Sequence, residues 1–158
     1  MQIFKESMKI FDNLGIKYEI KKHQSPVYTC EDAAKERGVV LAQVLKCMVG
    51  KDSEGNIYAM LLPGDRLLKI KKVRQIAQGA NISLAPTEEL AKLGLEVGAI
   101  SPVQLLGRAK FYMDKTVLNE EYITISSGAA DAGVMLKTKD LAGVIKPDLC
   151  DIIGGHTV

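Results

Sequence analysis

Residues 44–50 form an apolar run with a lysine in the middle, followed by a polar loop and a second apolar run. The loop at residues 52–56 and the returning segment at residues 57–62 complete the pattern of a buried β-hairpin. Period-two alternation gives Lys46 mostly apolar neighbours on its own face. An ammonium on such a face costs free energy unless an anion or several acceptors meet it. The hairpin therefore predicts a buried sheet and a polar partner for Lys46.

Short helices and short strands alternate along the rest of the chain. Helical spacing, capping residues and glycine stops predict helices at residues 2–14, 29–38, 73–79, 86–94 and from residue 138. Alternating apolar residues predict strands at residues 17–22, 81–84, 110–114, 122–126 and 133–137. The tail from residue 147 is apolar enough to dock, with a loose end at residues 154–156. Because many connections are of hairpin length, we expect one mixed α/β domain over residues 1–158, with a curved, barrel-like mixed sheet surrounded by short helices.

Composition limits the class of protein. The chain has 158 residues, of which 47% are hydrophobic and 25% charged, as in one soluble globular domain and unlike a disordered or fibrous protein. A net charge of +2 and an aromatic content of 5% give no general reason to expect DNA or single-stranded nucleic acid as a partner. No apolar stretch approaches the ~20 residues of a membrane helix, and the N-terminus does not resemble a signal peptide. We therefore expect a cytoplasmic protein with no membrane partner.

The usual sets of catalytic and metal-binding residues are missing from the sequence. There are only two histidines, and Cys30, Cys47 and Cys150 are too widely spaced for a zinc site or a disulfide framework. No metal and no cofactor is therefore expected. One alternative is a thiol hydrolase that uses Cys30 with His23. An ordinary loop histidine and a buried structural thiol explain the same residues equally well.

Two loops of small residues stand out. Residues 98–102 carry a glycine and a proline at their ends, and residues 126–130 read Ser-Ser-Gly-Ala-Ala. Such loops either merely turn the chain or bring backbone N–H groups close to a ligand. Thr29 begins a helix with an acidic first turn, where capping is its simpler role and ligand binding the alternative. Backbone donors with one cation would suit a phosphorylated or carbonyl-bearing ligand.

A basic run follows the hairpin. Five of nine consecutive positions are basic, namely Arg66, Lys69, Lys71, Lys72 and Arg74. Such a run is either a solvated helix face or a contact for the phosphate backbone of RNA. The sequence leaves both interpretations open.

Four motifs in register resemble the YbaK/prolyl-tRNA synthetase-associated editing-domain family. The first motif is residues 43–46 (Gln-Val-Leu-Lys), and the second is residues 63–65 (Pro-Gly-Asp) followed by residues 68–72. The third is residues 98–102 (Gly-Ala-Ile-Ser-Pro), and the fourth is residues 127–128 before residues 140–141. Together they cover nearly the whole chain. The resemblance implies a mixed α/β fold with a barrel-like sheet. It also implies a free-standing deacylase that removes a wrong amino acid from tRNA, most often tRNA(Pro).

The resemblance also implies roles for individual residues. The lysine matching Lys46 is essential and helps to anchor the 3′ end of tRNA. The loop at residues 98–102 shapes the aminoacyl pocket through its backbone. Many relatives have Gly-Gly where this chain has Gly98-Ala99, which bears on amino-acid specificity more than on the reaction class. The substrate-binding residues expected here are His23, Tyr28, Thr29, Gly98, Ala99, Ile100, Ser101, Pro102 and Gly128.

The expected function is hydrolysis of mischarged aminoacyl-tRNA, with tRNA(Pro) carrying Cys or Ala as the substrate. Lys46 would anchor the ribose-phosphate end, and N–H groups near Ile100 and Ser101 would orient the carbonyl. The expected partners are the acceptor end of aminoacyl-tRNA and prolyl-tRNA synthetase. The alternative is a non-catalytic module of the same fold that binds tRNA or a synthetase.

Overall fold

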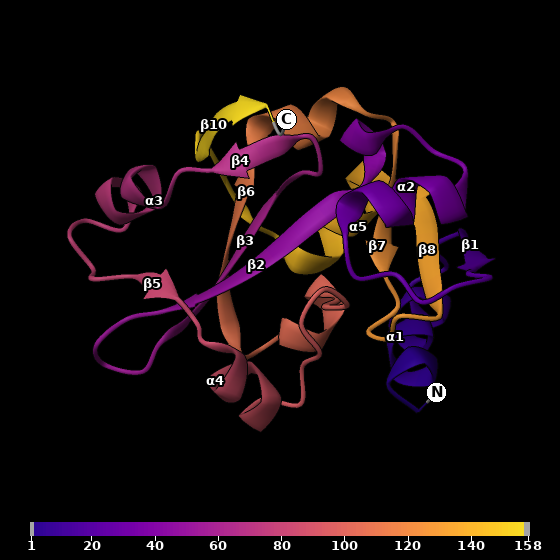
Figure 1. The fold of residues 1–158 in the computed structure, drawn as a ribbon, viewed down its shortest axis with the longest axis horizontal. Helices are drawn as coiled ribbons and strands as arrows, with labels where there is room; N and C mark the ends of the chain where they lie inside the picture. Colours follow the sequence, from indigo (N-terminus) through magenta and orange to yellow (C-terminus); the bar gives the residue numbers. More distant parts are fainter. Residues whose placement is uncertain (1, 157–158) are drawn as a thin grey trace.

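The computed structural model describes residues 2–156. Figure 1 shows the helices and strands interleaved along the chain. The α-helices are α1 (Gln2–Asn13), α2 (Cys30–Arg37), α3 (Ile70–Ile76), α4 (Thr87–Lys92) and α5 (Thr138–Ile145). Short 3-10 helices are η1 (Leu41–Gln43), η2 (Pro102–Leu105) and η3 (Lys115–Asn119). The strands are β1 (Tyr18–Lys22), β2 (Leu45–Lys51), β3 (Ile57–Pro63), β4 (Arg66–Leu68), β5 (Ser83–Leu84), β6 (Ala109–Asp114), β7 (Tyr122–Ser126), β8 (Ala132–Lys137), β9 (Asp148–Cys150) and β10 (Ile153–His156).

The predicted hairpin is the centre of the largest sheet. Strands β2 and β3 pair antiparallel from Leu45 opposite Pro63 to Lys51 opposite Ile57. The sheet has the order β5-β2-β3-β6-β9, in which β3 pairs parallel with β6 and β6 parallel with β9. Antiparallel and parallel pairs thus coexist in one sheet. The mixed α/β class is confirmed.

The barrel-like shape is not confirmed. The described strands form three sheets, of which the second has the order β1-β8-β7 and the third pairs β10 with β4. Among the described residues, the backbone pairing between the first two sheets is limited to an isolated parallel bridge between Val44 and Thr124. A barrel needs a continuous ladder that returns to its first strand, and among residues 2–156 no sheet closes in this way. Figure 1 shows the β1-β8-β7 sheet beside the larger one.

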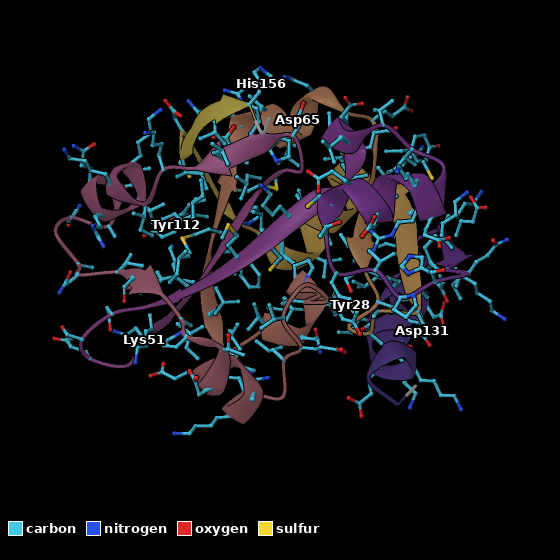
Figure 2. All side chains as sticks on the ribbon, in the orientation of Figure 1. Tyr28, Lys51, Asp65, Tyr112, Asp131 and His156 are labelled. Atoms are coloured by element: carbon cyan, nitrogen blue, oxygen red, sulfur yellow. The ribbon has the colours of Figure 1, made fainter. Side chains whose placement is uncertain are left out.

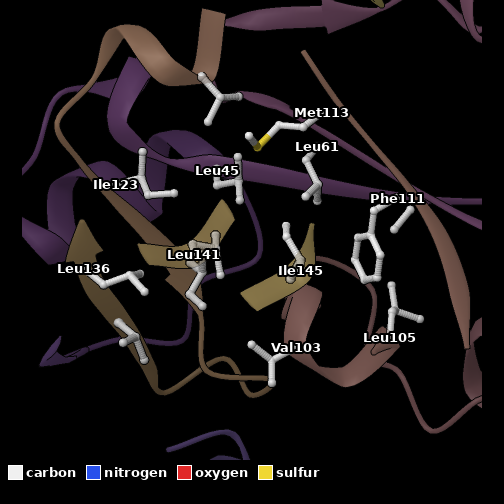
Figure 3. Packing of buried hydrophobic residues seen from close by; sticks show 14 of the residues in the cluster. Leu45, Leu61, Val103, Leu105, Phe111, Met113, Ile123, Leu136, Leu141 and Ile145 are labelled. Atoms are coloured by element: carbon white, nitrogen blue, oxygen red, sulfur yellow. The ribbon is translucent and has the colours of Figure 1, made fainter. Parts of the chain in front are cut away.

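Alternation along the central strands divides the core in two. Leu45, Leu61 and Phe111 face the larger cluster, which also contains residues of β7, β8, α1 and α5. Figure 3 shows Leu141 and Ile145 of α5 packed into this cluster. The opposite face of the sheet packs against a smaller cluster that includes Val73 of α3. Both faces of β2 and β3 are therefore covered, which explains their nearly continuous apolar sequence.

The C-terminal segment differs most from the sequence-based expectation. Residues 154–156, predicted to be a loose end, belong to strand β10, which pairs with β4. Arg66 Nη2 donates to Gly154 O at 2.6 Å. Lys72 Nζ donates to Ile153 O at 2.8 Å. Long basic side chains thus hold a glycine-rich strand that has little apolar surface of its own.

Candidate functional site

One cavity contains Lys46 and four of the nine predicted substrate-binding residues. Its volume is about 230 Å³, and it lies where the start of α2, the start of β2, the loop at residues 98–100 and the end of β7 meet. The lining residues are Val27, Tyr28, Thr29, Cys30, Ala33, Arg37, Val44, Leu45, Lys46, Cys47, Gly98, Ile100 and Ser126. Figure 2 shows Tyr28 towards the half of the molecule that carries Asp131, with Tyr112 in the other half. The structure therefore brings Lys46, Tyr28, Thr29, Gly98 and Ile100 to a single cavity.

A close backbone contact forms one wall of this cavity. Gly98 has φ +82°, and a Cβ at this position would lie 2.6 Å from the carbonyl oxygen of Tyr28. Neither the conformation nor the contact tolerates a side chain. Ala99, by contrast, has no positive φ, which explains why alanine is accommodated at the second position of this motif.

Lys46 meets a backbone acceptor. Its Nζ donates to the carbonyl oxygen of Arg66 in β4 at 2.7 Å. Among the described residues, no carboxylate pairs with this ammonium. Two of its three N–H groups are left for a ligand, and Lys46 lines the cavity. The polar partner predicted from the sequence is therefore partly provided by the protein itself.

The remaining residues of the 98–102 loop are buried. Ala99, Ser101 and Pro102 do not line the cavity. The Ser101 N–H donates to Gln104 Oε1 at 2.9 Å and is therefore not available to a ligand. The Ile100 N–H has no partner within residues 2–156. Of the two N–H groups expected to orient a carbonyl, only that of Ile100 is unoccupied.

Thr29 and Gly128 have structural contacts of their own. Thr29 is the N-cap of α2, and its Oγ1 accepts a hydrogen bond from the Asp32 N–H at 3.1 Å. The capping role predicted from the sequence is confirmed. Gly128 is buried with φ +97°, and its N–H donates to Ser126 Oγ. Ser126, not Gly128, lines the cavity.

His23 contacts Arg37 but is not among the residues that line the cavity. Its Nδ1 is 2.7 Å from the carbonyl oxygen of Ala130, and its Nε2 is 3.1 Å from Arg37 Nε. A carbonyl only accepts and a guanidinium only donates, so Nδ1 carries the proton and Nε2 accepts. Both ring nitrogens are therefore occupied by the protein.

Arg37 is the functional candidate that the sequence did not indicate. It is the last residue of α2, it lines the cavity, and only 5% of its surface is exposed. Burial lowers the pKa of its guanidinium to about 10, so it still carries a charge at neutral pH. The only local signal is its position four residues after Ala33, which places both residues on the buried face of the helix.

The thiols are unsuited to nucleophilic attack. Burial raises the pKa of Cys47 to about 12 and that of Cys150 to about 11. Burial also raises the pKa of Cys30, although the charges of Lys46 and Arg37 act in the opposite direction. Because His23 has no free ring nitrogen to take a proton, Cys30 and His23 do not form a nucleophile pair.

We expect all three thiols to react slowly with iodoacetamide at about pH 8, since only the thiolate reacts and each pKa lies above its usual value. Mass spectrometry of the labelled protein measures the rate at each cysteine. Labelling in urea is the control and should be fast. A cysteine that reacts as fast in the native protein as in urea would contradict this interpretation.

The basic run is divided between two environments. Arg66 and Lys72 hold β10, as described above, and Arg74 Nε donates to Ile82 O at 2.7 Å. Lys69 and Lys71 are exposed, and neither ammonium pairs with another described residue. The run is thus not a simple solvated helix face, because three of its five members stabilise the fold.

Neither a metal-binding cluster nor a membrane-spanning helix occurs among the described residues. Residues 2–156 contain no group of three or more His, Cys, Asp or Glu side chains arranged to hold a metal ion. None of the helices in this range is long and apolar enough to cross a bilayer.

Comparisons with known proteins agree on one family. The model of the family described as "Aminoacyl-tRNA editing domain" matches residues 24–144. The Ser/Thr-tRNA deacylase ProXp-y of Escherichia coli K12 is 26% identical over 140 residues, which cover 85% of this chain and 83% of that protein. The proline–tRNA ligase of Fusobacterium nucleatum is 31% identical over 96 residues, which cover 60% of this chain but only 17% of the ligase.

Solved structures show the same fold. A structure assigned as a candidate trans-editing enzyme for prolyl tRNA synthetase superposes with a TM-score of 0.84 at 21% identity, covering 98% of this chain and 96% of the other. The hypothetical protein APE2540 superposes with a TM-score of 0.85 at 24% identity, covering 93% of this chain and 98% of the other. From the match over residues 24–144, we conclude that the chain belongs to the aminoacyl-tRNA editing domain family.

Proposed function

We propose that this protein is a trans-editing deacylase that hydrolyses mischarged aminoacyl-tRNA, with tRNA(Pro) carrying Cys or Ala as its substrate. The observation that carries the proposal is a single cavity, in a member of the editing family, that combines Lys46 with the unoccupied N–H of Ile100. The relative ProXp-y is named for Ser- and Thr-tRNA, so all four acyl groups belong in the test. A volume of about 230 Å³ leaves room for any of these four acyl groups.

The chemistry proposed is ester hydrolysis without a side-chain base. Lys46 anchors the ribose-phosphate end of the substrate, and the Ile100 N–H donates to the ester carbonyl, on which negative charge develops. A ribose hydroxyl of the substrate assists the attacking water. The water oxygen bonds to the carbonyl carbon, the ester C–O bond breaks, and the ribose oxygen leaves with a proton. For a cysteinyl ester, the thiol of the substrate itself can replace water as the attacking group.

Deacylation of defined substrates tests this proposal. Purified protein is mixed with tRNA(Pro) charged with Ala, Cys, Ser, Thr or Pro, and release of the amino acid is followed by acid precipitation. We expect release from at least the Ala or Cys ester and none from the Pro ester. Binding of tRNA(Pro) without release from any ester would instead favour a non-catalytic module. Addition of prolyl-tRNA synthetase shows whether that enzyme is a partner.

The two unpaired lysines are proposed to contact tRNA phosphates. Converting both Lys69 and Lys71 to Gln should raise KM and reduce its salt dependence, by about one unit of the log–log slope for each lost phosphate contact. The measurement is KM for a mischarged tRNA over a series of KCl concentrations. Lys9→Gln on the exposed face of α1 is the matched control and should leave the slope unchanged. Equal slopes for the double variant and the wild type would rule out this contact.

A further inference from the structure

Arg37 is a buried cation without an acid partner. Arg37 lies at the end of α2 and packs against Thr124 of β7, which is fully buried, and Gly133 of β8. A Cβ at Gly133 would lie 2.1 Å from Arg37 Nε. No carboxylate within residues 2–156 forms an ion pair with it. Burying an arginine costs free energy that an ion pair normally offsets. The free protein therefore maintains a charge in this wall of the cavity with neutral partners alone.

The hydrogen bonds of Arg37 leave part of the guanidinium unused. Its Nε donates to His23 Nε2, and its Nη1 donates to Thr124 Oγ1, both at 3.1 Å. Of five N–H groups, three therefore have no partner among the described residues, including both on Nη2. Arg37 lines the cavity, and its unpaired Nη2 is not among the fully buried atoms that lack a partner, so a ligand in the cavity can reach it. The guanidinium is held in place and presents free donors to a ligand.

The charge of Arg37 also reaches Cys30, another residue that lines the cavity. Burial is the largest cause and raises the pKa of the Cys30 thiol; the ammonium of Lys46 and the guanidinium of Arg37 act to lower it, and the carboxylate of Glu31 acts to raise it. A ligand atom near Cys30 would experience the same two cations, opposed by the single carboxylate of Glu31. An acceptor or anion would therefore be favoured there over an alkyl group.

We propose that Arg37 makes the cavity selective for acyl groups whose β-carbon carries a hydrogen-bond acceptor or an anion, such as the thiol of Cys, the hydroxyl of Ser or the carboxylate of Asp, over the methyl group of Ala. This inference rests on the proposed function. A phosphodiester of the tRNA is joined to nucleotides on both sides, so it stays near the mouth of the cavity. The acyl group is the free end of the substrate and can reach Arg37, of which only 5% is exposed. We therefore assign Arg37 to the acyl side chain.

The test compares esters of one tRNA. Wild-type protein should cleave the Cys, Ser and Asp esters of tRNA(Pro) with higher kcat/KM than the Ala ester. In Arg37→Met, which keeps length and apolar volume, kcat/KM for the Cys and Asp esters should fall on the order of tenfold or more relative to the Ala ester. Arg37→Lys, which keeps the charge but loses the planar fork, should lie between the two.

Ratios between esters separate selectivity from stability, because a general loss of folded protein lowers all rates alike. Thr124 does not line the cavity, and Thr124→Val removes one hydrogen bond to the Arg37 guanidinium. This variant should have a lower melting temperature but the same order of preference among the esters. A uniform loss for all esters in Arg37→Met would overturn the inference and indicate a structural or phosphate-binding role. Should Arg37→Met fail to fold, a wild-type preference for Ala over Cys, Ser and Asp would overturn it equally. Failure of the wild type to cleave any ester overturns the proposed function itself.

Discussion

Lys46→Ala should reduce kcat/KM for mischarged tRNA on the order of 100-fold, equivalent to about 2.7 kcal/mol of lost transition-state stabilisation. Lys46 lines the cavity, its ammonium has no carboxylate partner among residues 2–156, and it has two N–H groups to offer beyond the Arg66 carbonyl. An anchored cation in a half-buried site is worth far more to an anionic substrate than one in water. Single-turnover rates at several tRNA concentrations measure the loss and divide it between binding and chemistry.

Two further variants make this result specific. Lys46→Arg keeps the charge and should retain part of the activity, since the guanidinium reaches a different position. Lys139→Ala on α5 removes an exposed lysine away from the cavity and should act like the wild type. Urea denaturation checks that the loss of the bond to Arg66, worth about 1 kcal/mol, does not unfold Lys46→Ala. Equal rates for Lys46→Ala and the wild type would refute the role of this residue.

Gly98→Ala should have the second large effect, through geometry rather than charge. The left-handed conformation alone disfavours alanine by about 1 kcal/mol. In addition, the new Cβ would lie 2.6 Å from the Tyr28 carbonyl oxygen, so the loop at residues 98–100 must move away from Tyr28. The Ile100 N–H would move with it. A displacement near 1 Å in a catalytic arrangement can lower the rate on the order of 100-fold.

Gly94→Ala is the matched control. Gly94 also has a positive φ, +78°, but a Cβ there would meet no atom within 4 Å. Both variants should lose stability from backbone strain, as measured by urea denaturation, and Gly98→Ala should lose more. Only Gly98→Ala should lose most of the deacylase activity. If both variants deacylate equally well, the contact between Gly98 and Tyr28 does not shape the cavity.

Part of this site could be predicted because strand alternation is a local property. Leu45, Cys47 and Val49 pack into the larger core cluster, whereas Met48 lies against the smaller one. The anomaly at Lys46 therefore follows from the sequence of one strand. The Thr29 cap also depends on neighbouring residues only, and it too was predicted correctly.

Other features depend on residues far apart in the chain. Nothing near Arg37 indicates that Thr124 and Gly133 surround it, so its burial could not be predicted. The Gly-Gly pair before His156 is typical of a loose end, and becomes a strand only because β4 offers an open edge. The basic run was ambiguous for the same reason, since its partners lie elsewhere in the chain: Gly154 and Ile153 in β10, and Ile82 in the loop before β5.

The pairing of β1 with β8 has a consequence for how this protein folds. Tyr18 pairs with Leu136, so the first and one of the last strands must meet before the sheet behind the cavity exists. Contacts between residues so far apart in the sequence form slowly, because closing the long intervening loop costs conformational entropy. During synthesis, the hairpin of β2 and β3 can form while this sheet is still incomplete. Arg37 can acquire its partner Thr124 and the close contact at Gly133 only after residues 124 and 133 have been synthesised, so shorter chains lack this wall of the cavity.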